Sequence, residues 1–167
     1  ELYFQSKDST EPVTVEIRTM ENGTITDTIV PYSTVTVAAA NVNISSNASS
    51  ATKFVFPSLV YLNQDKEYAF IVRTTSLNYK LWVSRLSETD VTTGFVINKA
   101  PYAGSLFKSQ NMTTWTEDQF EDIKFTLNRA SFKTNTTYTC TLNNKPVTSV
   151  NLKTDSLSFT SGSASIT

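Results

Sequence analysis

The stretch VTVEIRTMENGTITDTIV, residues 13–30, predicts the fold of the first part of the chain. Its apolar and polar residues alternate, so in an extended strand two sets face opposite ways: Val13, Val15 and Ile17 against Thr14, Glu16 and Arg18. Asn22-Gly23 follows, a dipeptide that tolerates positive φ and is typical of hairpin turns. β-Branched residues then continue on both sides of Pro31 as far as Ala39. We therefore expect a half-buried strand, a turn and a second strand.

Short strand patterns continue along the rest of the chain without a helical period. The polar stretch from Asn41 to Thr52 separates them from the first hairpin, and we expect it to be a surface loop. The further expected strands are Lys53–Val55, Tyr68–Arg73, Lys80–Leu86, Phe95–Asn98 and a closing core strand, Ile123–Leu127. Thr114–Phe120 is the exception, because its spacing resembles a capping box and predicts a single helical turn. Together these patterns predict an all-β fold, an antiparallel β-sandwich that is jelly-roll-like.

The expected sandwich occupies residues 7–133. Residues 1–6, ELYFQS, resemble the remnant of a tobacco etch virus protease site, and we expect them to lie outside the fold. Residues 134–167 hold few large apolar side chains, and their alternating segments Tyr138–Leu142 and Val147–Leu152 predict a β-hairpin connector toward a further module, with Cys140 as a small packed residue. The predicted core of the sandwich is Val15, Ile17, Phe54, Phe56, Phe70, Val72, Leu81, Val83, Phe125 and Leu127.

Composition narrows the class of function. The chain has 167 residues, 14 Lys+Arg, 15 Asp+Glu, no His and one Cys. A net charge of -1 without a basic run lacks the electrostatic footprint of a nucleic-acid binder, so no nucleic-acid partner is expected. No stretch is long and apolar enough for a membrane helix, so no membrane insertion is expected. With no His and one Cys there is no thiolate or imidazole zinc cluster, and no metal or cofactor is expected. An all-oxygen calcium site at the turn residues Asp65 and Asp90 is the open alternative, but no loop shows a dense series of ligands, and ordinary turn capping is favoured.

Three longer segments carry a resemblance to a known family. They are FVFPSLVYLNQDKEYAFIV (residues 54–72), YKLWVSRLSETDVTTG (79–94) and PYAGSLFKSQNMTTWTEDQFEDIKFTLNRASF (101–132). This part of the chain, from about Glu11 to Phe132, resembles a β-rich module of large multidomain virion structural proteins of contractile-tailed, T-even-like bacteriophages. The resemblance implies a location in the phage particle, in the tail, baseplate or fibre region, with other virion proteins as partners. It implies no catalytic residues.

Aromatic residues are the candidates for a second kind of partner. Sugars stack on exposed aromatic faces, and the candidate platform residues are Trp82, Tyr79, Trp115 and Tyr102. Trp82 shares a strand face with Lys80 and Ser84, which is typical of a solvent-facing platform, but packing under a loop or on the second sheet is the favoured alternative. For Trp115 the favoured alternative is a plug that holds its loop onto the end of the sandwich. These residues predict host-surface carbohydrate as an alternative ligand.

Catalysis is the least favoured alternative. The absence of His excludes Ser-His-Asp and Cys-His arrangements, and no Gly-rich phosphate loop is present. A glycosidase needs two carboxyls, and the dense acidic cluster is Glu117, Asp118, Glu121 and Asp122. On a helical turn Glu117 would share a face with Glu121, and Asp118 with Asp122, but a solvated acidic turn is the commoner arrangement. We therefore expect a non-enzymatic virion module that acts as a rigid scaffold or adhesion domain.

Overall fold

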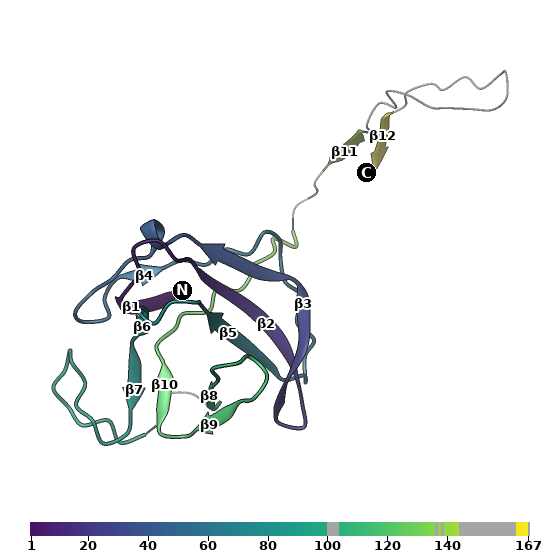
Figure 1. The fold of residues 1–167 in the computed structure, drawn as a ribbon. Coiled ribbons are helices and arrows are strands. Elements are labelled where there is room, and N and C mark those ends of the chain that lie inside the picture. Colours follow the sequence, from purple (N-terminus) through teal and green to yellow (C-terminus); the bar gives the residue numbers. More distant parts are fainter. Residues whose placement is uncertain (100–103, 136, 138, 144–162, 167) are drawn as a thin grey trace, which may run out of the picture. The chain divides into compact units, whose positions relative to one another are not determined.

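The chain folds entirely with β-strands and one short 3-10 helix in the part that the structure describes. This computed structural model describes residues 1–99, 104–135, 137, 139–143 and 163–166. The chain divides into two compact units, Glu1–Arg129 (the first unit) and Ala130–Thr167 (the second unit). All strand pairs among these residues are antiparallel, and they form several small sheets (Figure 1). The all-β class and the antiparallel pairing are therefore confirmed, and no described helix could span a bilayer.

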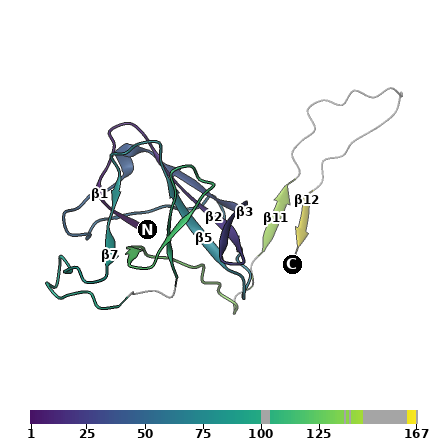
Figure 2. The same cartoon turned by 60° about the horizontal axis from the view of Figure 1, so that its bottom comes forward.

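The central sheet of the first unit is built on the expected hairpin. Its strands are β2 (Val13–Glu21), β3 (Thr24–Val37) and β5 (Tyr68–Arg73), in the order β3-β2-β5 (Figure 2). Asn22 and Gly23 form the turn with φ values of 50° and 73°, as the dipeptide predicts. The bounds of β5 are those expected from its alternation.

Strand β3 remains paired with β2 beyond Pro31 because the Ser33 side chain forms hydrogen bonds with the backbone of β2. Tyr32 adopts a φ of 63°, and the register between β2 and β3 shifts at this point. The Ser33 hydroxyl accepts from the Ile17 amide at 3.2 Å and lies 3.1 Å from the Ile17 carbonyl. A buried side chain thus replaces the backbone groups that the bulge displaces, so the two expected segments form one continuous strand.

Residues 1–6 were expected outside the fold, and this expectation is wrong. Leu2–Ser6 forms β1, which lies between β4 (Ala51–Thr52) and β6 (Lys80–Leu81). Phe4 is fully buried and contacts the rings of Phe54 and Tyr79, with centroids 6.4 and 5.8 Å away. A strand with partners on both edges and an apolar inner face belongs to the fold whatever its sequence resembles.

Two further strand pairs complete the first unit. Strand β7 (Val83–Arg85) pairs with β10 (Glu121–Ile123), and β8 (Leu106–Lys108) pairs with β9 (Thr116–Asp118). The helical turn expected at Thr114–Phe120 is therefore wrong, because this segment contains β9; the helix instead is η1 (Ala39–Asn41). The expected Lys80–Leu86 strand is interrupted at Trp82, while Lys53–Val55 and Phe95–Asn98 form no strands of their own.

The core follows one face of β2. Its buried members are Leu2, Phe4, Val13, Val15 and Val42, and around them pack partly buried residues that include Phe54, Phe56, Val72, Leu81 and Phe125. Three of the predicted core residues are exposed: Phe70 at 38%, Val83 at 41% and Leu127 at 73%. The strand at Glu121–Ile123 ends before Leu127, so the alternation that placed Leu127 in the core stops earlier than expected.

The opposite face of β2 is also buried, and it carries charges. Glu16 is fully buried and accepts from Arg18 Nε at 2.8 Å and Nη2 at 2.7 Å. Its other carboxylate oxygen accepts from Arg73 Nε on β5 at 3.1 Å, and Arg18 also reaches Asp27 at 3.2 Å. The four formal charges sum to zero, so the buried carboxylate lies among groups of opposite charge that compensate it.

Asp8 joins the β1–β2 connection to a distant loop. Its Oδ1 accepts from the backbone amides of Thr10 and Glu11, at 2.8 and 3.0 Å. Its Oδ2 accepts from the Ser76 hydroxyl at 2.6 Å and from the Asn78 amide at 2.7 Å. The Ser76 hydroxyl and these further donors hold the pKa of Asp8 well below its usual range.

Lowering the pH below about 4 should weaken the hydrogen bonds of Asp8 to the loop at Ser76 and Asn78. Because the pKa of Asp8 is depressed in the folded state, its ionised form stabilises the fold above the unfolded pKa of about 3.9, and the contribution is lost as pH falls further. We expect Asp8→Asn to melt below wild type at neutral pH, and we expect the difference in melting temperature to narrow below about pH 4. Thermal melts from neutral to acidic pH measure it, with Glu88→Gln as a control on an exposed carboxylate. A difference that stays constant with pH would contradict this role.

The second unit contains the antiparallel pair β11 (Cys140–Asn143) and β12 (Ser163–Ile166). An antiparallel pair is what the connector was expected to contain, but the partner of the first strand comes from the Ser/Gly-rich end. The segment Val147–Leu152 lies outside the described residues. Cys140 is exposed, so the expectation that it is packed is wrong.

Candidate functional site

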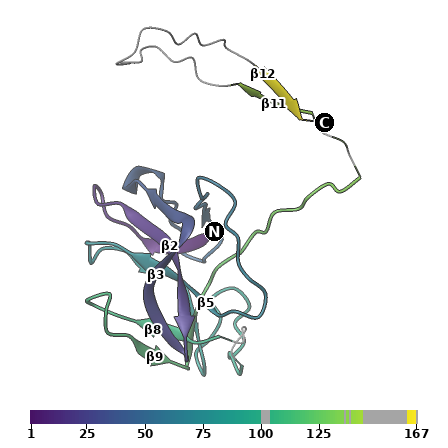
Figure 3. The same cartoon turned by 90° about the vertical axis from the view of Figure 1, so that its right-hand side faces the viewer.

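A groove in the first unit is the candidate site. It has a volume of about 750 Å³, and residues of β5 and of the segments that carry β8, β9 and β10 line it. Strands β5, β8 and β9 can be followed in the ribbon of Figure 3. Apolar and aromatic side chains dominate the described lining, which includes Tyr68, Phe70, Phe107, Trp115 and Phe125. This size and composition are typical of small-ligand sites. A second hollow of about 590 Å³ near Asn43 and Lys53 has no aromatic residue in its described lining, so it is the weaker candidate.

The two walls of the groove come from distant parts of the chain. One wall is the face of β5 that alternation directs toward the core, with Tyr68, Phe70 and Val72. The other wall comes from β8, β9 and β10, with Phe107 and Ile123. The rings of Phe70 and Phe125 meet with centroids 4.9 Å apart, which joins the two walls. Phe70 is partly exposed because it faces this groove.

Of the four candidate platform residues, Trp115 is the one whose place fits a binding site. It lies just before β9, is partly buried and lines the groove. Trp82 is also partly buried, but its indole N–H donates to the Ser45 carbonyl at 2.9 Å. Trp82 therefore packs against the loop that follows η1, which is the alternative considered from the sequence.

Tyr79 packs in the core of the first unit and does not form part of a sugar platform. Its ring packs edge-on against Phe4 in the core, and its hydroxyl donates to the Glu11 carbonyl at 2.5 Å. Burial, with the charges of Asp8 and Glu11, raises the pKa of Tyr79. Tyr102 lies outside the described residues. The expected four-residue platform is thus not assembled from the three residues that the structure describes, since Tyr79 and Trp82 contact other parts of the fold.

The acidic cluster is divided in two by strand geometry. Asp118 and Glu121 both accept from the Lys108 ammonium on β8, and Glu121 also lies 3.6 Å from Arg85. Glu117 and Asp122 instead line the groove. The pairing that a helical turn would have given, Glu117 with Glu121 and Asp118 with Asp122, does not occur, because the segment is extended at β9 and β10.

The two carboxyls of the acidic cluster that line the groove lie in different environments. The Ser105 hydroxyl donates to Glu117 at 2.6 Å, the Gln119 amide donates to the same oxygen at 3.2 Å, and both lower the pKa of Glu117. Burial raises the pKa of Asp122. Glu117 is thus held as an oriented anionic acceptor, and Asp122 is the less hydrated of the two acids.

The turn aspartates form no metal site. The Asp90 carboxylate accepts from the amides of Thr92 and Thr93 and from the Thr93 hydroxyl, which is ordinary turn capping and lowers the pKa of Asp90. Asp65 occupies a turn with a φ of 62°. Within the described ranges, no group of three or more acidic or cysteine side chains could hold a metal ion.

Sequence reasoning missed most of the groove. Tyr68 and Phe70 were assigned to a strand and not to a site, and Ser105 and Phe107 were not singled out. The short alternation in SLFKS, residues 105–109, is the signal that could have revealed β8. Comparisons of the chain with models of protein families, with curated proteins and with solved structures find no match.

Proposed function

We propose that the chain is a non-enzymatic structural module of a tailed-bacteriophage particle, located in the tail region and bound to other virion proteins. Two things support this: the sequence resemblance across residues 11–132, and an apolar surface on a hydrogen-bonded hairpin, Ser87–Ile97. The hairpin is the observation that carries the proposal. A module whose task is to hold neighbouring subunits needs apolar contact surface on a scaffold that does not rearrange.

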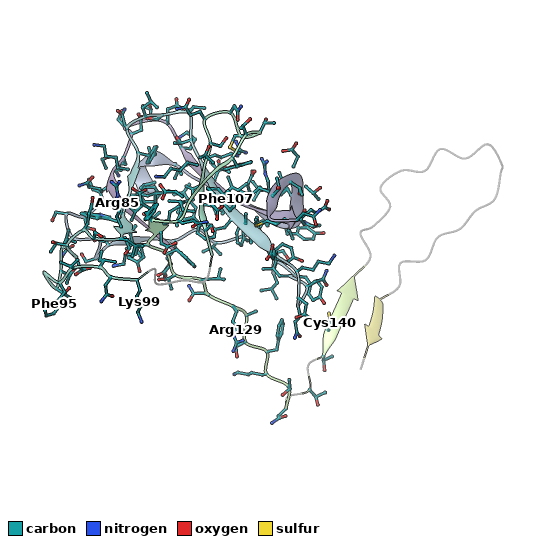
Figure 4. The ribbon with its side chains drawn as sticks, turned by 90° about the horizontal axis from the view of Figure 1, so that it is seen from below. Arg85, Phe95, Lys99, Phe107, Arg129 and Cys140 are labelled. Carbon is teal, nitrogen blue, oxygen red and sulfur yellow. The ribbon has the colours of Figure 1, made fainter. Side chains whose placement is uncertain are left out.

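The hairpin is held by its own backbone. Ser87 donates to the Ile97 carbonyl, Ile97 donates to Glu88, and Asp90 donates to Phe95, each at 2.9 Å. The Asp90 carboxylate caps the turn, which Gly94 closes with a φ of 74°. Near the tip, Val91, Phe95 and Val96 are exposed at 60%, 77% and 63%. Phe95 lies at the periphery of the unit, whereas Phe107 lies inside it (Figure 4).

We also propose that the small sheets are an irregular form of the jelly-roll-like sandwich. The core supports this, because the apolar face of β2 packs against side chains from β1, β6 and β10. Such packing is what two facing β-layers require.

Particle incorporation tests the structural proposal. An antiserum against the chain should detect it in density-purified phage particles, and in the tail fraction after disruption. The double change Phe95→Ser and Val96→Ser should leave the melting temperature unchanged, because both side chains are exposed, and should reduce incorporation. Leu77→Ser, at a side chain 97% exposed outside the hairpin, is the matched control. A chain absent from particles would contradict the proposal.

Carbohydrate binding is a second candidate function, favoured by the position of Trp115 in the groove. A sugar ring stacked on that indole would change its fluorescence. We expect a titratable change with a bound saccharide that Trp115→Phe reduces and Trp82→Phe does not abolish, since the Trp82 indole is bonded to the loop. An unchanged response in Trp115→Phe would place the ligand elsewhere.

A further inference from the structure

We infer that the groove selects saccharides that carry no anionic groups and binds amine-bearing sugars best. The inference rests on the carbohydrate-binding candidate and adds the chemical class of the ligand. It is argued from the acidic side chains that line the groove and from the lack of basic side chains in its described lining.

Carboxylates are the charged groups of the described lining. They are Glu67, Glu117 and Asp122, and the described lining contains neither lysine nor arginine. Lys108 is the basic residue of the adjoining β8, and its ammonium is held by Asp118 and Glu121. Bound uronate, sialate or phosphate groups would therefore meet acidic side chains without a compensating cation, which disfavours acidic polysaccharides.

Glu117 provides the oriented polar contact. Its carboxylate is positioned by Ser105 and Gln119, and these two donors leave its second oxygen without a contact from either. An ionised carboxylate accepts hydrogen bonds from sugar hydroxyls, and it forms stronger, charge-assisted bonds with an ammonium group. The site therefore distinguishes a protonated amino sugar from a neutral sugar at the same ring position.

The aromatic walls favour the same class. Trp115 and Phe107 line the groove on one side, and Tyr68 and Phe70 line it on the other. Aromatic rings can stack on the apolar face of a sugar. Aromatic faces also attract cations and do not attract anions. Stacking and charge thus predict one order of affinity: amine-bearing first, neutral second and acidic last.

Matched trisaccharides test the inference. The probes are β-1,4-linked trimers of glucosamine, glucose and glucuronate, titrated by calorimetry in mildly acidic buffer, where the amine is protonated. We expect the glucosamine trimer to bind about tenfold more tightly than the glucose trimer, corresponding to about 1.4 kcal/mol, and the glucuronate trimer to bind most weakly. Added salt should narrow the differences, because they are electrostatic.

Two variants and a control localise the effect. Glu117→Gln should keep binding of the glucose trimer and lose most of the preference for glucosamine, whereas Trp115→Ala should weaken all three trimers. Glu88→Gln removes an exposed carboxylate that is paired with Arg85 and absent from the described lining, so it should change nothing. Each variant is first checked for an unchanged melting temperature.

The outcomes separate the inference from the function on which it rests. Binding of the glucuronate trimer as tight as that of the glucose trimer, or a preference for glucosamine that survives Glu117→Gln, overturns the selectivity and leaves carbohydrate binding standing. No binding of any trimer by the folded protein overturns both. Failure in these titrations leaves the structural proposal to be judged by particle incorporation alone.

Discussion

Truncating Phe4 to Ala is expected to lower the free energy of unfolding of the first unit by about 3–5 kcal/mol. Phe4 is fully buried, and its ring contacts Phe54 and Tyr79 at the centre of the core. Its backbone pairs with Leu81 of β6, and its carbonyl accepts from the Ser45 amide at 3.0 Å. Removing the ring leaves a cavity inside the core. Because the net stability of a folded domain is small, the cost of this cavity is a large part of it.

Denaturant unfolding followed by tryptophan fluorescence measures this change. Phe120→Ala is the matched control, because that ring is 68% exposed and its removal should cost less than about 0.5 kcal/mol. A Phe4→Ala variant as stable as Phe120→Ala would mean that β1 is not part of the folded unit in solution. That result would restore the expectation, drawn from the resemblance to a protease-site remnant, that residues 1–6 lie outside the fold.

Glu16→Gln is the second change with a large expected effect, about 3–5 kcal/mol of lost stability. The glutamine keeps the shape of the side chain but removes the charge that compensates Arg18, whose side chain is only 10% exposed. One oxygen of the carboxylate also becomes an NH₂ group directed at an arginine donor. The buried Arg18 guanidinium then keeps Asp27 as its carboxylate partner, and the Asp27 side chain is 87% exposed, so its charge compensates Arg18 poorly.

The same unfolding experiment measures it. Glu88→Gln serves as the control, since its pair with Arg85 is exposed on both sides and should contribute about 0–1 kcal/mol. The double change of Glu16 to Leu and Arg18 to Met should lose less stability than Glu16→Gln, because it leaves no buried charge without a partner. A Glu16→Gln variant no less stable than the control would show that the cluster adds nothing to the fold.

Local signals explain the part of the fold that could be predicted. The hairpin of β2 and β3 and the bounds of β5 follow from alternation and from Asn22-Gly23, all of which act within a few residues. Alternation also placed Val15 and Ile17 inside correctly. It failed for Glu16, because a polar position can be buried when Arg73, 57 residues away, supplies the opposite charge.

The candidate site could be predicted only in part. The sequence singled out Trp115 and the acidic cluster, and Trp115 with Glu117 and Asp122 of that cluster lines the groove. Helical spacing gave the wrong pairs of acids, because the pairing of β8 with β9 and of β7 with β10 overrides the local capping pattern. Trp82 was equally visible as an aromatic residue in a strand, and a bond to Ser45, 37 residues earlier, determines that it packs under a loop.

The sequence by itself determined an all-β chain, the position of its main hairpin and the absence of histidine chemistry. These depend on residue type and on spacings of one or two residues. Tertiary structure decided that Leu2 and Phe4 are core, that Glu16 is buried and that Glu117 and Asp122 share a groove with Trp115. Burial and site composition are properties of contacts between strands distant in the chain, and alternation within one strand does not record which other segment covers its face.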